Sequence, residues 1–164
     1  MKRIFTVIAV VILSMLSTSV NAQNLKVGAG LTYGSEIGSL GLRADGVYSI
    51  NNDFSAEAAF TYFLEKDYLK WSVLDLNAHY NYVKSSDLTV YALAGLNMTF
   101  WSLSLGDEDF GGFGFDASGT DTGVNIGTGA RKKLSDKIDL FGEVKYVLGG
   151  GKFFSISGGV LFSL

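Results

Sequence analysis

The sequence predicts an all-β protein, an eight-stranded antiparallel up-and-down transmembrane β-barrel. Three observations support this prediction. Segments of about ten residues alternate apolar and polar side chains, as expected for a β-strand with two different faces. There are eight such segments, and an even number of strands allows every backbone polar group to pair in a closed cylinder. The connections between the segments are short turns and mostly longer loops in alternation.

The composition excludes several classes of protein. Hydrophobic residues make up 48% of the 164 residues and charged residues only 18%, which argues against intrinsic disorder. The absence of cysteine excludes disulfides, thiolate metal sites and cysteine nucleophiles. A single histidine argues against a multi-histidine metal site, and we expect no cofactor. The net charge of -3 argues against nucleic-acid binding.

The first 22 residues predict a cleaved signal peptide. Two basic residues precede an apolar run over residues 4–16, and small residues then allow cleavage after Ala22. The alternative is an N-terminal membrane anchor, but the apolar run is shorter than the ~20 residues a helix needs to span. We therefore expect export and a mature barrel domain of residues 23–164, with a net charge of -5 after Lys2 and Arg3 are removed.

The first four segments show the alternation most clearly. Residues 25–33 place leucine, valine, alanine and tyrosine on one face, opposite lysine, glycine and threonine. Residues 40–50 oppose leucine, tyrosine and isoleucine to arginine, aspartate and serine, and residues 54–64 oppose aromatics and alanines to serine, glutamate and threonine. Residues 73–83 alternate apolar side chains with aspartate, asparagine and histidine. Each segment has the length of a tilted strand crossing a bilayer.

The last four segments complete the predicted barrel. Residues 88–100 are apolar on both faces, so their facing is ambiguous, although Asn97 suggests which face points inward. Residues 122–132, 138–148 and 153–164 again alternate, with asparagine, charged or serine residues on the second face. The polar face of each strand is expected to line the lumen, and the apolar face to contact lipid.

The connections predict the orientation. Short turns are expected at residues 51–53, 84–87 and 133–137. Longer connections are expected at residues 34–39, 65–72, 101–121 and 149–152. Outer-membrane barrels combine short periplasmic turns with long extracellular loops, so we expect both termini in the periplasm.

Aromatic residues near the ends of the predicted strands support a membrane location. Those expected outside are Tyr33, Tyr48, Phe54, Tyr62, Tyr82, Tyr146, Phe154 and Phe162. At the two interfaces they would form the aromatic girdles of a membrane barrel.

Charged residues on the inward faces predict a network inside the barrel. The expected members are Lys26, Arg43, Asp45, Glu57, Asp75, Arg131, Glu143 and Lys145. An eight-stranded barrel is just wide enough for side chains to fill it, so four positive and four negative charges are expected to pair and plug the lumen. The alternative is an ion path along the same residues.

Two other parts of the sequence contain candidate functional residues. His79, the only histidine, is interpreted as a lumen residue, because no serine nucleophile lies near it on its face. The connection at 101–121 combines acids, phenylalanines and glycines that could hold Ca²⁺ or Mg²⁺ or contact a partner, although no firm metal site follows. The loop candidates are Asp107, Glu108, Asp109, Phe110, Phe113, Phe115 and Asp116. The alternative is a solvated, variable loop.

The pattern as a whole, with segments such as Leu40–Tyr48 and Val90–Asn97, resembles small eight-stranded outer-membrane barrels of the OmpA/OmpX type. The nearest family is the stand-alone outer membrane protein beta-barrel domain of Gram-negative bacteria. The resemblance covers residues 23–164 and implies fold rather than role. One departure is the final residue, Leu164, where the family commonly carries an aromatic that the barrel-insertion machinery recognises.

The expected function is a monomeric outer-membrane barrel that is not an enzyme. Its role is expected to be structural, in membrane integrity, with surface loops available for adhesion or defence. The expected partners are outer-membrane lipid, lipopolysaccharide and, during insertion, the barrel-assembly machinery. The alternatives are a narrow porin-like pore, a lipid A-modifying enzyme and a soluble lipocalin-like carrier in the periplasm.

Overall fold

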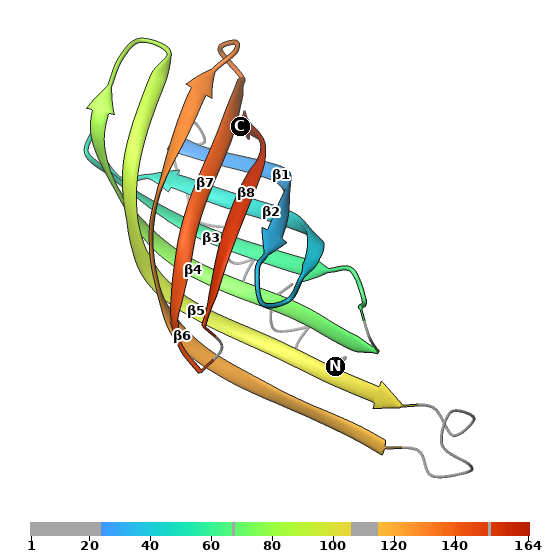
Figure 1. Cartoon of the computed structure of the whole chain (residues 1–164). Coiled ribbons are helices and arrows are strands. Elements are labelled where there is room, and N and C mark those ends of the chain that lie inside the picture. Colours follow the sequence, from blue (N-terminus) through green and yellow to red (C-terminus); the bar gives the residue numbers. More distant parts are fainter. Residues whose placement is uncertain (1–23, 67, 106–114, 151) are drawn as a thin grey trace.

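The structure is a computed structural model and describes residues 24–66, 68–105, 115–150 and 152–164. Eight strands form one closed antiparallel barrel in which each strand pairs with its neighbours in sequence and β1 pairs with β8 (Figure 1). This confirms the predicted fold class. Among the described residues, no helix is long and apolar enough to cross a membrane.

The strands lie close to their predicted positions. They are β1 (Leu25–Gly34), β2 (Ser39–Ser49), β3 (Phe54–Phe63), β4 (Leu69–Lys84), β5 (Leu88–Leu105), β6 (Phe115–Lys133), β7 (Ile138–Gly149) and β8 (Phe153–Ser163). The expected signal peptide lies outside the described residues, and its cleavage remains an expectation.

Three strands are longer than predicted, at the end of the barrel that carries the long connections. Parts of 65–72 and 101–121 were expected as loops, but β4 already begins at Leu69, β5 continues to Leu105 and β6 begins at Phe115. The reason is that these segments pair with one another: Leu69 lies opposite Leu103, and Leu105 lies opposite Phe115. Figure 1 shows β5 and β6 extending beyond the other strands.

The alternation separates two surfaces as expected. The eight outward aromatics predicted above are exposed on the barrel wall, with exposed fractions from 37% to 52%. The facing of β5, which the sequence left ambiguous, is also resolved: Tyr91, Leu93 and Asn97 point inward and are at most 2% exposed. The outer wall is therefore apolar, which suits contact with lipid tails.

The lumen is not polar throughout. At the long-loop end, Ile37 of the β1–β2 connection packs with inward Phe63, Val73, Val147 and Phe153. A second apolar cluster, toward the short-turn end, consists of Val47, Phe141 and Leu161. Strand alternation alone predicts polar inward positions, whereas these clusters show apolar side chains closing parts of the lumen. The central part of the polar network lies between them.

Candidate functional site

Arg43 is the centre of the polar network. Its side chain is 0% exposed and reaches from β2 to strands on both sides of the lumen. Nε donates to Asp45 Oδ1 at 2.6 Å, and Nη2 donates to Glu57 Oε1 at 2.9 Å. Nη1 donates to Glu143 Oε1 at 3.0 Å and to Ser157 Oγ at 3.1 Å. One guanidinium thus ties together four strands, using the forked donor geometry that lysine lacks.

A second ion pair lies in the same interior. Lys145 of β7 pairs with Asp75 of β4, and the two side chains are 3% and 1% exposed. Asn97 and Asn125 each donate to Asp75 Oδ1, at 2.7 and 2.9 Å. The carboxylate therefore keeps hydrogen-bond donors on both of its oxygens, which offsets much of the cost of burying it.

Arg131 has a different environment from the other buried cations. Its guanidinium lies over the Tyr91 ring, 4.5 Å from the centroid, and Nη2 lies 3.0 Å from His79 Nδ1. The His79 and Tyr91 rings stack at 4.3 Å. Because arginine can only donate, Nδ1 must accept, and the ring proton of a neutral His79 then lies on Nε2.

The eight residues predicted for the network occupy two regions. All except Lys26 are buried, and the central contacts join Arg43 to Asp45, Glu57 and Glu143. Lys26 lies instead at the short-turn end of the lumen, where it pairs with Asp139. Arg131 contacts no predicted partner carboxylate within 4.0 Å in the described part of the chain, so the expected pairing of every charge does not extend to it.

The sequence reasoning missed several members of the network. Asp139 lies on the polar face of its predicted strand but was not among the eight residues expected in the network, and it is the partner of Lys26. Asn77 donates to Glu57 Oε2 at 2.7 Å, and the Tyr91 hydroxyl donates to Glu143 Oε2 at 3.2 Å. Alternation could have indicated these inward residues, but the choice of partners depends on which strands face each other across the lumen.

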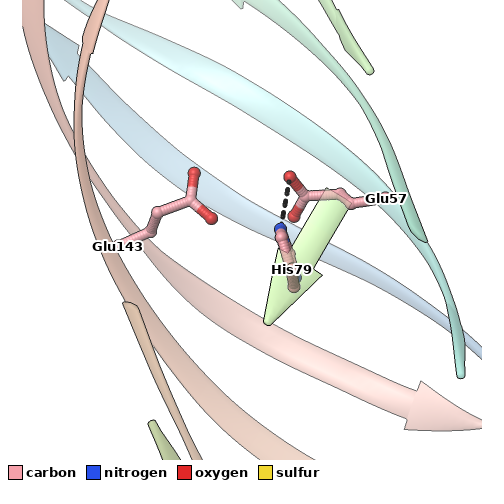
Figure 2. A group of neighbouring side chains, drawn as sticks. All are labelled: Glu57, His79 and Glu143. Carbon is pink, nitrogen blue, oxygen red and sulfur yellow. Dashed lines mark ion pairs between the residues drawn. The ribbon is translucent and has the colours of Figure 1, made fainter. Parts of the chain in front are cut away.

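Glu57, His79 and Glu143 form the group of side chains that most resembles a metal site (Figure 2). One ligand atom from each lies within 4.8 Å of the others, and His79 Nε2 is 3.4 Å from Glu57 Oε2. Two features argue against a resident ion. Arg43 already binds both glutamates, and Nε2 carries the ring proton when Arg131 donates to Nδ1. We therefore assign Arg43 as the cation that holds these carboxylates.

Of the seven loop candidates, the structure describes two, and both lie in β6. Asp107, Glu108, Asp109, Phe110 and Phe113 lie outside the described residues. Phe115 and Asp116 belong to β6, where their backbones pair with Leu105 and Ser104. Ion binding or partner contact by this group stays a prediction.

A charged contact marks the turn between β6 and β7. Lys133 Nζ lies 2.9 Å from Asp136 Oδ1. The hydrogen bond and the charge of Lys133 lower the pKa of the Asp136 carboxyl below its usual value. The stabilisation is therefore present at neutral pH and is lost as the pH falls through that lowered pKa. Because both groups are exposed to solvent, the contact adds little to stability.

Gly129 makes room for the Tyr91 ring, which leads to a prediction. A Cβ at Gly129 would lie 2.4 Å from Tyr91 Oη and 2.9 Å from the Gly142 carbonyl oxygen. We expect Gly129→Ala to displace Tyr91 and to lower the free energy of unfolding by about 1–3 kcal/mol, the usual cost of overpacking. Urea unfolding of the barrel in lipid vesicles would measure this change.

The matched control is Gly142→Ala, because a Cβ there meets no atom of the described residues within 4 Å. This variant should unfold at nearly the wild-type urea concentration. Equal effects of the two substitutions would contradict the packing role assigned to Gly129.

Comparisons with known proteins agree with the architecture. A family model described as "Outer membrane protein beta-barrel domain" matches residues 7–159. No curated protein sequence matches the chain. Among solved structures, the N-terminal β-barrel domain of Pseudomonas aeruginosa OprF is similar, with 17% identity and a TM-score of 0.67, covering 85% of this chain and 97% of that chain.

Two further solved structures share the fold. Neisserial surface protein A is 21% identical with a TM-score of 0.65, covering 85% of this chain and 96% of that chain. Ail, the attachment invasion locus protein of Yersinia pestis, is 17% identical with a TM-score of 0.59, covering 84% and 95%. At these identities the likeness concerns the fold alone.

Proposed function

Because the chain belongs to the outer membrane protein beta-barrel domain family, we propose that it is a non-conducting membrane barrel that presents a surface for attachment or defence. The family places the protein in the outer membrane. Our proposal adds a structural role in membrane integrity and a contact surface at the long-loop end. The expected partners are lipid, lipopolysaccharide and the barrel-assembly machinery during insertion, and the barrel acts as a monomer without nucleic acid.

The extended part of the β4–β5–β6 sheet is the observation that carries the attachment role. The last β3–β4 pair joins Tyr62 to Ser72, and the last β6–β7 pair joins Gly123 to Gly149. Beyond these pairs, residues 69–71, 100–105 and 115–121 form a sheet that projects past the barrel wall. At about 3.4 Å per residue, the β6 part extends roughly 20 Å. We call this segment the projecting sheet.

The projecting sheet has an ordered inner face and an edge, along residues 115–121, that pairs with no strand on the β7 side in the part of the chain that the structure describes. Trp101 lies between Trp71 and Gly119 in neighbouring strands, and its Nε1 donates to Asp121 Oδ2 at 3.1 Å. A Cβ at Gly119 would lie 2.6 Å from the Trp101 ring, so only glycine allows this packing. Unpaired backbone groups at a sheet edge can pair with an extended segment of another protein.

The charge at this end favours a cationic partner. The four longer connections, as delimited in the sequence, contain eight acidic and three basic residues. Acidic loops repel polyanions unless divalent cations bridge the two. We therefore also propose that Ca²⁺ or Mg²⁺ bridges loop carboxylates and lipopolysaccharide phosphates. Ail has been solved with the heparin analogue sucrose octasulfate, a polyanion. We propose that this chain instead binds basic surfaces of other proteins.

Attachment is tested with cells that produce the protein at equal surface levels. We expect wild-type cells to adhere to immobilised basic extracellular protein, and the double variant Ser118→Lys, Thr120→Lys to lose most of this adhesion. Both side chains are exposed on the projecting sheet. The control is Ser135→Lys in the β6–β7 turn at the opposite end, which should adhere normally. Equal adhesion of all three would overturn the attachment role.

The structural role is tested separately, by measuring leakage of a periplasmic enzyme from a deletion strain.

The narrow pore is the second candidate. It predicts conductance in planar bilayers that changes when Arg43 or Glu57 is neutralised. Arg43 and the carboxylates around it are at most 3% exposed, and an apolar cluster lies in the lumen on either side of them, so we expect no stable conductance steps.

The lipid A-modifying enzyme remains disfavoured. It would use His79 as the base, but that ring is 1% exposed, with Nδ1 3.0 Å from Arg131 Nη2 and Nε2 3.4 Å from Glu57 Oε2. An unchanged lipid A mass on overproduction is the expected result.

A further inference from the structure

A polar pocket opens at the end of the barrel that carries the short turns. We call it the vestibule. It has a volume of about 250 Å³ and is lined by residues of the short turns and by inward residues near the adjoining strand ends. Among the residues that line it are Lys26, Asn81, Asp87, Arg131, Lys133 and Asp139. The volume is smaller than the 300–1,000 Å³ of pockets for drug-sized molecules, so a ligand would have to be small.

Arg131 gives the vestibule an unmatched positive charge. The residue is only 7% exposed, and its Nε has no hydrogen-bond partner in the described structure. The other buried or half-buried lumen cations each contact a carboxylate: Arg43 contacts Glu57, Lys145 contacts Asp75, and Lys26 contacts Asp139. A buried guanidinium without a carboxylate is costly, and a bound carboxylate would relieve that cost.

Asn81 supplies the complementary unmatched acceptor. Its Nδ2 donates to the Asn52 carbonyl oxygen at 3.3 Å and lies 3.5 Å from Ser55 Oγ, whereas its Oδ1 accepts from no donor among the described residues. The backbone register places it near Arg131, because Asn81 pairs with Tyr91 on β5, and Thr89 on the same strand pairs with Arg131. A ligand that fits both residues would present an oxyanion and an N–H close together.

The remaining charges limit the ligand to a single negative charge. Lys26 is neutralised by Asp139, and Lys133 by Asp136. Asp87 lines the vestibule as a carboxylate and would repel a dianion. Arg131 and Asp87 then remain as one positive and one negative group in a pocket that is otherwise lined mainly with serine and asparagine side chains.

We propose that the vestibule binds an α-amido carboxylate, the group found at the C-terminal end of a peptide chain. The carboxylate contacts the Arg131 guanidinium, and the adjacent N–H donates to Asn81 Oδ1. Since short turns face the periplasm in outer-membrane barrels, the ligand would be a periplasmic solute. This inference does not depend on the role proposed for the projecting sheet at the opposite end.

The test uses the ¹⁵N-labelled, folded full-length barrel in detergent micelles, titrated with N-acetylglycine. We expect saturable shifts of the Arg131 Nε–H and Asn81 side-chain amide resonances. N-acetylglycinamide, which lacks the carboxylate, should bind at least tenfold more weakly. Glycine, which carries an ammonium group instead of the amide, distinguishes a free amino acid from a peptide end. Tighter binding of glycine than of N-acetylglycine would overturn the peptide-end assignment.

Variants distinguish a specific binding site from general attraction between charges. Arg131→Gln should weaken binding of N-acetylglycine at least tenfold, whereas Lys133→Gln, which removes a cation at the same pocket, should weaken it less than threefold. Equal weakening would overturn the proposal. Because Arg131 also packs on Tyr91, heat-dependent gel mobility would check that its variant is folded. If the Arg131→Gln variant is not folded, Asn81→Asp provides the test instead. A carboxylate at position 81 should abolish binding of N-acetylglycine, and undiminished binding would rule the site out.

Discussion

Replacing Arg43 with methionine is expected to lower the free energy of unfolding by about 3–5 kcal/mol, the largest loss of any single substitution considered. The substitution keeps a similar side-chain length but leaves Asp45, Glu57 and Glu143 buried without the cation that binds all three. Urea unfolding in lipid vesicles, followed by tryptophan fluorescence and gel mobility, would measure the loss.

Two controls separate the cost of unpaired charge from the loss of a side chain. Lys84→Met removes the exposed pair with Asp53 and should cost less than about 1 kcal/mol. Arg43→Met combined with Asp45→Asn, Glu57→Gln and Glu143→Gln removes all four charges and should recover most of the stability. If the single and quadruple variants were equally unstable, packing rather than charge would explain the effect of Arg43.

Leu76→Arg is expected to have the second largest effect. Leu76 is 43% exposed on the outer wall, in the part of β4 between Ser72, which pairs with Tyr62, and the outward Tyr80. This places it near the bilayer midplane, where an arginine costs about 2–4 kcal/mol. We expect the variant to unfold at lower urea concentration in vesicles and to insert less efficiently, with a weaker band of heat-modifiable mobility.

The matched control is Leu134→Arg, in the turn between β6 and β7. Leu134 is also exposed, at 56%, but it belongs to a short turn, which is expected to face the aqueous periplasm rather than lipid. It should behave like the wild type. A soluble lipocalin-like carrier would tolerate arginine equally at both positions, so equal stability of the two variants would contradict the membrane orientation of the outer wall.

The sequence by itself determined the number of strands, their order and which face of most strands is apolar. The reason is that strand period, turn residues and bilayer thickness are local constraints. Residues 73–83 illustrate this: alternating apolar and polar residues assign both the lipid-facing and the lumen-facing side chains, and the structure places His79 and Leu76 accordingly. Asn97 was likewise enough to indicate the inward face of β5.

Only the tertiary structure decided which inward residues meet. Arg43 of β2 contacts Glu143 of β7, 100 positions away in the chain, because closure of the barrel brings these strands to face each other. The same closure pairs Lys26 with Asp139 and places Arg131 against His79 and Tyr91, with no carboxylate of the described residues as its ion-pair partner. The extension of β4, β5 and β6 also depends on partners in neighbouring strands. Inward contacts and strand ends are set by pairing across the closed sheet, which alternation along one strand does not specify.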